Sequence, residues 1–481
     1  MNQTKYSKLI LAAWLFTISI VTILTAATLI KHGMFMDAML YTSVSHNLSH
    51  GIGSFWFPFF DEYNVANLTS FHEQPPLVFG IQALFFKLLG DSMYVERFYT
   101  FFTMCINGLL IKVLWDEITK ENLKLRPYAW LAILLWITIP VCFWSYSNNM
   151  HENTMSVFIL CSVVFSYKAM QSKTDNYFNY VLAGFFISLA VLSKGFPGFF
   201  PITLPFLHWL IIRRKSFFKT FIYSSIILLI LIIIGIALYL YPSSNESLSI
   251  YLFKRAFQRI NEVPSVDSRF FIFWRLLSEL IPIFIFTAVF FGIARWKKML
   301  NQLNSQYQQA FLFIALGICG SLPLMLTKVQ NGFYFVPSLP YFGIGFALLT
   351  APIIHLLFQK IQIKYHQNLV TISSMILIGT LIFTYFQKDK YSRDKDLLND
   401  IHNIAQIVPT QSRINCSNSV YQNWSLNCYL VRMHDISINN IEMKRHDSPY
   451  FINEINGTNP DAQLYEEVKL NNKQYTLYKK R

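Results

Sequence analysis

The sequence predicts a polytopic α-helical membrane protein that ends in a small polar α/β domain. Of its 481 residues, 53% are hydrophobic, 17% are aromatic and only 14% are charged. This composition is typical of chains that expose much of their surface to lipid. Eleven apolar runs are long enough to cross a bilayer, and the composition becomes polar from about Lys388. We therefore expect a membrane domain over residues 1–387 and a soluble domain over residues 388–481.

The apolar runs define the expected crossings and one exception. The segment 76–89 has about 14 residues, which at about 1.5 Å each reach only about 21 Å of a hydrocarbon core that is about 30 Å thick. We expect it to be re-entrant or interfacial. The crossings are predicted near residues 9–30, 94–115, 128–146, 154–171, 178–193, 196–212, 219–241, 270–293, 307–326, 333–356 and 367–386.

The positive charge predicts an orientation. The formal net charge of +14 arises largely from Lys and Arg in short connections between apolar runs, so it indicates anionic lipid and membrane topology and not a nucleic acid partner. The positive-inside rule places these connections in the cytoplasm together with the N-terminus. The loop 31–93, the turn 147–152, the loop 241–269 and the tail then share the other side. The cytoplasmic connections are 112–126, 168–173, 213–215, 295–298 and 360–364.

The polar tail shows alternating helix and strand patterns. An amphipathic stretch covers 397–407 and ends before Pro409, and strand-like runs lie at 413–416, near Tyr450 and at 474–478. The tail also contains Cys416 and Cys428. These could form a disulfide if the tail faces an oxidising compartment, or they could remain thiols.

Three acidic residues fall where predicted membrane segments meet water, which is a costly position and therefore a candidate site. Asp37 follows the first crossing in a stretch with helical spacing, so it could act as a general base or hold a metal. Glu73 precedes Pro75 and Pro76, which favour a rigid, extended entry into a helix. Glu152 lies at the next exterior turn. For Asp37 and Glu152 the alternative is a first-turn acid that stabilises a helix N-terminus.

Cations on the predicted exterior face depart from the positive-inside rule. A bound phosphate would explain them, because Arg and Lys are its usual protein ligands. The alternative is that their long side chains reach lipid head groups. The residues concerned are Lys254, Arg255, Arg259, Arg269 and Lys328.

The order of several short motifs resembles that of the protein O-mannosyltransferase and lipid A aminoarabinose transferase superfamily. The most specific stretch runs from Phe71-His72-Glu73-Gln74-Pro75-Pro76-Leu77 through Gly90 to Arg97, and it is similar to the family's acidic-x-Pro-Pro-Leu helix, turn and following Arg. Further motifs are 192–198, the loop ending at Arg259, and 327–340. One departure is Gln74, where aminoarabinose transferases have Lys.

This resemblance implies a C-type membrane glycosyltransferase that uses a polyprenyl phosphate sugar and inverts the anomeric centre. Asp37 would be the base, with Glu73 and Glu152 as partners. The acceptor would be a lipid, a glycan or a protein at the periplasmic face of an inner membrane. The remaining implied contacts are Arg255, Arg259 and Lys328 to the lipid phosphate, Gln74, Arg97, Lys194 and Tyr334 to substrate, and Asp37, His72 and Glu73 to a possible divalent metal.

Two other functions fit many of the same features. A transporter or flippase for a lipid-linked glycan would also need many crossings, but it should carry charges near mid-membrane, whereas here the charges gather at one interface. A polymerase or ligase of surface polysaccharide would use similar substrates and differ mainly in its acceptor.

Overall fold

The computed structural model describes residues 6–61, 70–258, 265–300, 306–442, 447–457 and 463–481, and the chain forms two compact units. Unit 1 consists of Met1–Thr28, Thr100–Ser147 and His151–Gln387. Unit 2 consists of Leu29–Tyr99, Asn148–Met150 and Lys388–Arg481. The polar tail therefore shares a compact unit with the segment that follows the first helix.

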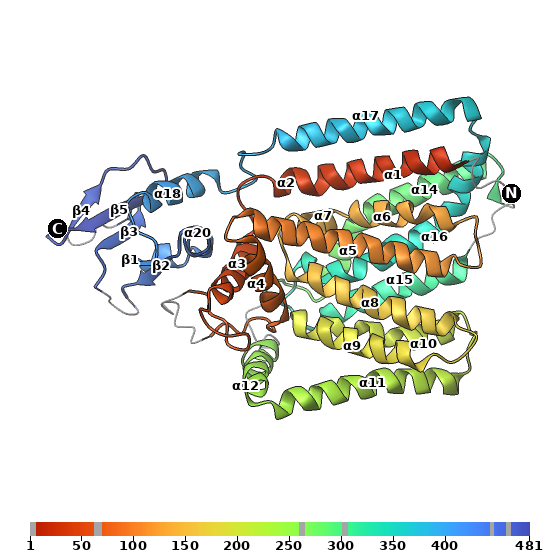
Figure 1. The fold of residues 1–481 in the computed structure, drawn as a ribbon, viewed down its shortest axis with the longest axis horizontal. Helices are drawn as coiled ribbons and strands as arrows, with labels where there is room; N and C mark the ends of the chain where they lie inside the picture. The colour runs from red at the N-terminus through yellow and green to blue at the C-terminus, as the bar shows by residue number, and fades with distance from the viewer. Residues whose placement is uncertain (1–5, 62–69, 259–264, 301–305, 443–446, 458–462) are drawn as a thin grey trace. The chain divides into compact units, whose positions relative to one another are not determined.

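Unit 1 is a bundle of helices, among which α1 and α17 lie side by side (Figure 1). Its elements are α1 Ser7–Val21, η2 Thr22–Ala26, α2 Ala27–Leu29, α5 Tyr94–Ile118, η3 Arg126–Tyr128, α6 Ala129–Ile137, α7 Pro140–Tyr146, α8 His151–Gln171, α9 Tyr177–Lys194, η4 Phe196–Thr203, α10 Leu204–Ile211, α11 Phe217–Leu240, α12 Pro242–Tyr251, η5 Leu252–Ala256, α13 Phe271–Glu279, α14 Ile281–Trp296, α15 Tyr307–Ser321, η8 Leu322–Leu326, η9 Gly332–Ser338, α16 Leu339–Lys360, η10 Ile363–Tyr365 and α17 His366–Tyr385, with the first turn of α5 and the end of α2 in unit 2.

The described residues contain eight helices that are long and apolar enough to cross a membrane, or ten if each of two bent pairs is one span. This confirms the predicted polytopic class. One bent pair is α6 and α7, which meet at 87°. The bend follows from Pro140, because a proline forces the preceding Ile139 into an extended conformation (ψ 125°) that interrupts the helix.

The predicted crossing at 196–212 is formed by η4 and α10, which together are shorter than the full spans. The eight residues of η4 form a 3-10 helix that rises about 2.0 Å per residue, and the eight of α10 rise about 1.5 Å each. Placed end to end they reach about 28 Å, so this segment approaches the thickness of a bilayer core of about 30 Å.

Helix α11 shows why these segments need lipid. It has a mean hydropathy of 2.9 over its best window, yet only 11% of that window is buried. Its Ser216 cap accepts a hydrogen bond from the Lys219 backbone N–H, which satisfies one of the unpaired donors at the helix start. An apolar surface of this size is stable in a hydrocarbon environment and not in water.

Polar contacts tie the basic connections of unit 1 together at one end. Arg214 pairs with Glu121 at 3.0 Å, and Lys219 pairs with Asp175 at 2.8 Å. The loops after α5, α8 and α10 therefore meet. Because α9 begins just after Asp175 and ends at Lys194, Lys194 lies at the other end of that helix.

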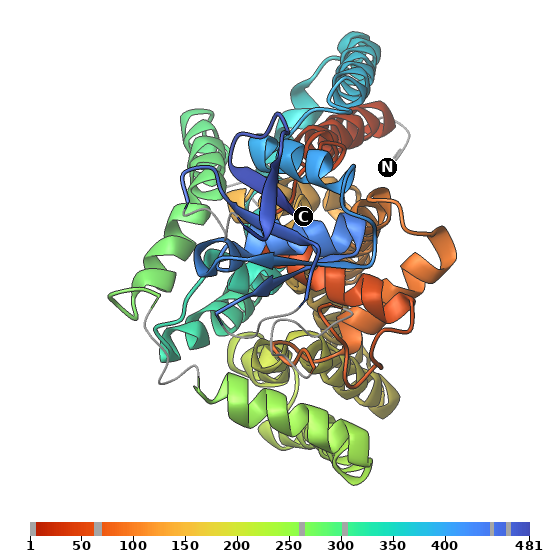
Figure 2. The ribbon, with the colours of Figure 1, turned by 90° about the vertical axis from the view of Figure 1, so that its left-hand side faces the viewer.

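Unit 2 contains a five-stranded sheet in the tail with the order β2-β1-β3-β5-β4 (blue in Figure 2). Strand β1 is parallel to both β2 and β3, whereas β5 is antiparallel to β3 and β4. The predicted helix and strand patterns of the tail are confirmed, and the structure adds β2 and β4. The elements are α3 Met36–Ser49, α4 Leu77–Leu89, α18 Lys395–Ala405, β1 Ser412–Cys416, α19 Asn418–Tyr421, α20 Trp424–His434, β2 Ile436–Asn440, β3 Tyr450–Glu454, β4 Tyr465–Val468 and β5 Tyr475–Lys480.

One hydrophobic core joins the tail to α3 and α4. The hydroxyl of Tyr429 in α20 accepts a hydrogen bond from the Met34 N–H at 2.9 Å and lies 2.7 Å from the Met34 carbonyl oxygen. Arg432, also in α20, pairs with Glu96 at 2.8 Å, and both side chains are almost completely buried. The tail is therefore an integral part of unit 2.

We expect the Tyr429→Phe variant to destabilise unit 2 by about 1–3 kcal/mol, because the buried Met34 N–H loses its partner. Hydrogen exchange at the Met34 amide should become faster, and the melting temperature in detergent should fall. Tyr385→Phe is the control, since Tyr385 is 68% exposed. If the hydrogen-exchange rate of the Met34 amide is unchanged in Tyr429→Phe, the Tyr429 hydroxyl does not stabilise the backbone at Met34.

Candidate active site

Asp37 lies in the first turn of α3, where unpaired backbone N–H groups favour a carboxylate. Hydrogen bonds fix the backbone before Asp37, and burial restricts the helix after it. The Phe35 N–H donates to the Asn148 side-chain oxygen at 2.9 Å, and the Met34 backbone is bound to Tyr429. Every residue from Ala38 to Asn47 is buried. Asp37 itself is half-buried, so its carboxylate occupies a fixed, partly accessible position.

Glu73 precedes the start of α4 and is also half-buried. Its neighbour Gln74 is buried and donates through its amide to the Tyr41 hydroxyl at 3.2 Å. The Tyr41 ring packs edge-on against Phe71 and Phe79, with ring centroids 6.2 and 6.1 Å apart. Gln74 thus connects the chain beside Glu73 to the aromatic core of unit 2.

The carboxylates of Asp37 and Glu73 act electrostatically on the same thiol. Burial raises the pKa of Cys428 well above its ordinary value, and the negative charges of Asp37 and Glu73 raise that pKa further. Cys416 is buried as well, and both cysteines are free thiols, so the tail holds no disulfide between them. Two of the predicted acids, both in unit 2, therefore lie within electrostatic range of Cys428.

Glu152 belongs to unit 1 and forms a buried ion pair there. Its carboxylate oxygen lies 2.5 Å from the ammonium nitrogen of Lys194, and the side chains are 0% and 7% exposed. The Lys194 nitrogen also lies 5.5 and 5.7 Å from the ring centroids of Phe333 and Tyr334. The structure thus unites three predicted residues, Glu152, Lys194 and Tyr334, and adds Phe333, which the sequence did not single out.

The remaining predicted cations have different environments. Arg255 is half-buried at the last turn of η5, and Lys328 is exposed. The Lys328 carbonyl accepts hydrogen bonds from the Ser265 N–H and hydroxyl, both at 3.1 Å, which fixes the backbone that carries this lysine. Arg259 lies outside the described residues.

Arg97 has structural partners in unit 2. Its guanidinium donates to the carbonyls of Lys31, at 3.1 Å, and Met93, and it lies 3.5 Å from the carboxylate of Glu96. Only 6% of the residue is exposed. A substrate contact by Arg97 stays a prediction, while its visible contacts bind the start of α5 to the chain that leads to α3.

The sequence suggested a metal at Asp37, His72 and Glu73, and that assignment also stays a prediction. The His72 ring nitrogen lies 2.6 Å from the Ser70 hydroxyl. Among the described residues, the ligand atoms that converge to within 4.8 Å of one another belong to another set, His46, His50 and Asp91.

Comparison with known families supports the expectation from the motifs. Residues 73–239 match the family model for dolichyl-phosphate-mannose-protein mannosyltransferase. No curated protein sequence matches the chain. The matched segment begins at Glu73, the acid of the most specific predicted motif.

The fold is similar to that of two solved membrane enzymes. ArnT from Cupriavidus metallidurans, in a crystal structure bound to undecaprenyl phosphate, aligns over 99% of this chain and 98% of its own, with a TM-score of 0.67 and 12% identity. The archaeal oligosaccharyltransferase AglB from Archaeoglobus fulgidus, in complex with an inhibitory peptide and a dolichol-phosphate, aligns over 95% of this chain and 70% of its own, with a TM-score of 0.53 and 13% identity. The predicted C-type fold is confirmed, and the family match over residues 73–239 supports the superfamily resemblance.

We expect Lys194→Met to destabilise unit 1 by about 3–5 kcal/mol, because it leaves the Glu152 carboxylate buried without its cation. The double variant Glu152→Gln with Lys194→Met should recover most of the loss. Thermal unfolding of the purified protein in detergent measures both effects. The control Lys219→Met breaks an exposed pair with Asp175 and should change stability little. A double variant no more stable than Lys194→Met alone would contradict a dominant ion pair.

Proposed function

We propose that the protein transfers a sugar from a polyprenyl phosphate to an acceptor hydroxyl or phosphate and inverts the anomeric centre. The observation that carries this proposal is that Asp37 and Glu73 stand at the starts of the packed helices α3 and α4 in one compact unit, and that both act electrostatically on Cys428. The match of residues 73–239 to a mannosyltransferase family supports it. So does the likeness to ArnT and AglB, whose structures contain undecaprenyl phosphate and dolichol-phosphate.

In this proposal Asp37 is the general base. Its carboxylate takes the proton of the acceptor hydroxyl while the oxygen attacks the anomeric carbon of the donor. The bond between that carbon and the phosphate oxygen breaks, and its electron pair stays on the phosphate. Inversion follows from attack on the face opposite the leaving group. The products are the glycosylated acceptor and polyprenyl phosphate.

Phosphate is a good leaving group, so cations that match its growing charge can supply much of the rate enhancement. We assign this role to Arg255, Arg259 and Lys328. The fixed backbone at Lys328 supports its assignment, because a held chain limits the entropy lost when the side chain binds phosphate.

We assign Lys194 and Tyr334 to substrate contact and Glu152 to positioning Lys194. At 2.5 Å from Lys194, Glu152 fixes the ammonium group beside the rings of Phe333 and Tyr334. A cation and aromatic rings at one place can bind an anionic or sugar group. This assignment makes Glu152 a positioning residue in the reaction.

The proposed location is an inner membrane with the reaction on its periplasmic face. The basic connections of unit 1 meet at one helix end, which the positive-inside rule assigns to the cytoplasm. Lys194 lies at the opposite end of α9 and would then face the periplasm. The acceptor is a lipid, a glycan or a protein on that side.

We expect Asp37→Asn to reduce sugar transfer by roughly 10²- to 10⁴-fold, because the amide cannot accept the acceptor proton. Binding of polyprenyl phosphate should persist. Purified protein with a polyprenyl phosphate sugar and a candidate acceptor gives both readouts. Asp389→Asn is the matched control, since the Asp389 side chain is 73% exposed. Full activity in Asp37→Asn would remove the central assignment, and translocation of the donor across vesicles without transfer would favour a flippase.

We expect Lys328→Ala and Arg255→Ala to weaken the binding of polyprenyl phosphate by about tenfold each, and the effect should shrink as salt rises. Lys298→Ala, in a basic connection of unit 1, should bind the lipid like wild type. The dissociation constant for polyprenyl phosphate in detergent, at two salt concentrations, provides the test. Equal affinities in all four proteins would mean that the cations contact lipid head groups instead.

A further inference from the structure

Two histidines and an aspartate of unit 2 form a cluster that the proposed reaction does not use. His46 and His50 lie one turn apart at the end of α3, with ring centroids 4.5 Å apart. Asp91 lies in the turn between α4 and α5. Both Nε2 atoms, of His46 and of His50, lie 3.3 Å from the same carboxylate oxygen of Asp91.

These separations suit a tetrahedral metal ion. Zinc binds imidazole nitrogen and carboxylate oxygen at about 2.0–2.2 Å, which places neighbouring ligand atoms about 3.3–3.5 Å apart around a tetrahedron. The three ligand atoms here all lie within 4.8 Å of one another. An ion of this size fits among them with small side-chain movements.

The surrounding contacts prepare the imidazoles to bind a metal. Nδ1 of His50 lies 3.0 Å from the His46 carbonyl oxygen, a contact that favours the tautomer with its proton on Nδ1 and with Nε2 available to a metal. The His46 ring is fixed by edge-on packing against Phe86, at 5.3 Å. Its Nδ1 lies 3.9 Å from a carboxylate oxygen of Asp435, which is beyond hydrogen-bond distance but close enough to attract a metal-bound ring electrostatically.

The ring of His46 is buried and has nitrogen atoms that could bind a cation. It is 4% exposed, and neither of its ring nitrogens makes a hydrogen bond of good geometry within the described part of the chain. A cation between Nε2 of His46 and the Asp91 carboxylate oxygen, which lie 3.3 Å apart, would give this buried nitrogen a partner.

Arg432 supports this arrangement. Its guanidinium donates to the carbonyls of Asp91 and Ser92, at 3.1 and 3.2 Å, and thereby holds the turn that carries the aspartate. Its positive charge is balanced by the pair with Glu96 at 2.8 Å. The charge that would oppose a metal is therefore largely offset.

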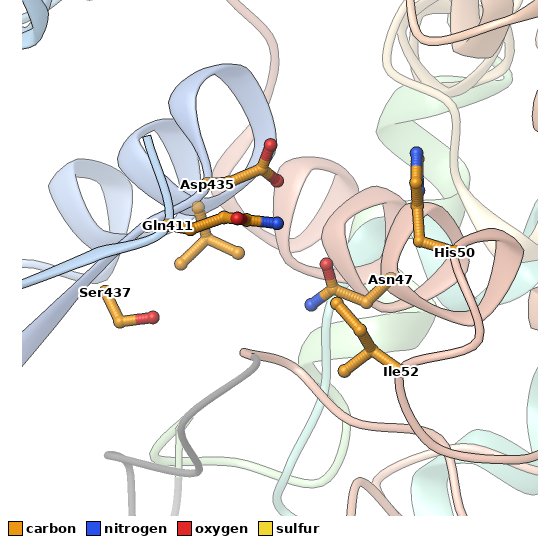
Figure 3. A pocket seen from close by; sticks show the side chains of 7 residues that line it. Asn47, His50, Ile52, Gln411, Asp435 and Ser437 are labelled. Carbon is orange, nitrogen blue, oxygen red and sulfur yellow. The ribbon is translucent and has the colours of Figure 1, made fainter. Parts of the chain in front are cut away.

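The side of the cluster near His50 is open. A small pocket next to it is lined by His50, Asn47, Gln411, Asp435 and Ser437 (Figure 3). The side chains of His50 and Asp91 are 45% and 61% exposed. An ion could enter from this side, and a water molecule could fill the fourth position.

We propose that His46, His50 and Asp91 bind one divalent ion of the zinc class, which pins the end of α3 to the turn after α4. Two nitrogens and one oxygen favour zinc over magnesium or calcium, which prefer all-oxygen sites. This metal site is independent of the proposed transfer reaction. It lies on the same helix as Asp37, so its occupancy would stiffen the helix that carries the candidate base.

The test is zinc binding by the full-length protein in detergent, with any polyhistidine tag removed and metals stripped by a chelator. Competition with a chromophoric chelator should show one zinc ion per chain with micromolar or tighter affinity. Zinc should raise the melting temperature and slow hydrogen exchange at residues 46–50 and 90–92. X-ray absorption should show two imidazole nitrogens and oxygen ligands.

Matched variants separate a built site from surface binding. His50→Ala and Asp91→Asn alter exposed side chains and should each weaken zinc at least tenfold. His402→Ala, outside the cluster, should bind zinc like wild type, and millimolar magnesium should not compete. The proposal is wrong if wild type binds no zinc, or if both cluster variants bind it as tightly as wild type. Neither result bears on Asp37, because no readout here uses sugar transfer.

Discussion

The candidate site depends most directly on the two hydrogen bonds between the Tyr429 hydroxyl and the Met34 backbone. Helix α3 has only 14 residues, and a helix of that length is marginal in water without tertiary packing. Its stability comes from the core that it shares with α4 and α20, and the Tyr429 hydroxyl fixes the chain three residues before Asp37. The tail therefore helps to position the candidate base, because one of its side chains fixes the chain just before Asp37.

Each unit also contains a buried ion pair that joins two of its elements. In unit 2 the Glu96–Arg432 pair joins the start of α5 to α20, and in unit 1 the Glu152–Lys194 pair joins the start of α8 to the end of α9. A buried pair contributes little net stability over an apolar substitute, but removing one partner is costly. We therefore infer that these pairs mainly fix how the two joined helices align with each other, and that they add little net stability.

Local patterns in the sequence were sufficient for the membrane helices and for part of the tail. Continuous apolar runs such as 219–241 and the amphipathic stretch 397–407 each encode their own helix, found as α11 and α18. Strand β2 was missed because Ile436–Asn440 alternates weakly and is buried by its neighbours in the sheet, which no local pattern records. The same limit applies to the site. Asp37, Glu73 and Glu152 could be named individually, whereas the Glu152–Lys194 pair and the position of Cys428 depend on how distant segments pack.

Gln74 is the residue at which the most specific motif departs from the aminoarabinose transferases. Its neutral amide donates to Tyr41 within a cluster of aromatic rings, where a lysine would have to bury its charge. Burial keeps the Cys428 thiol protonated, so that side chain is neutral as well. Neither residue beside Asp37 and Glu73 supplies a positive charge. The neutral amide of Gln74 thus stands next to Glu73 at the position where those enzymes have a lysine before the two prolines.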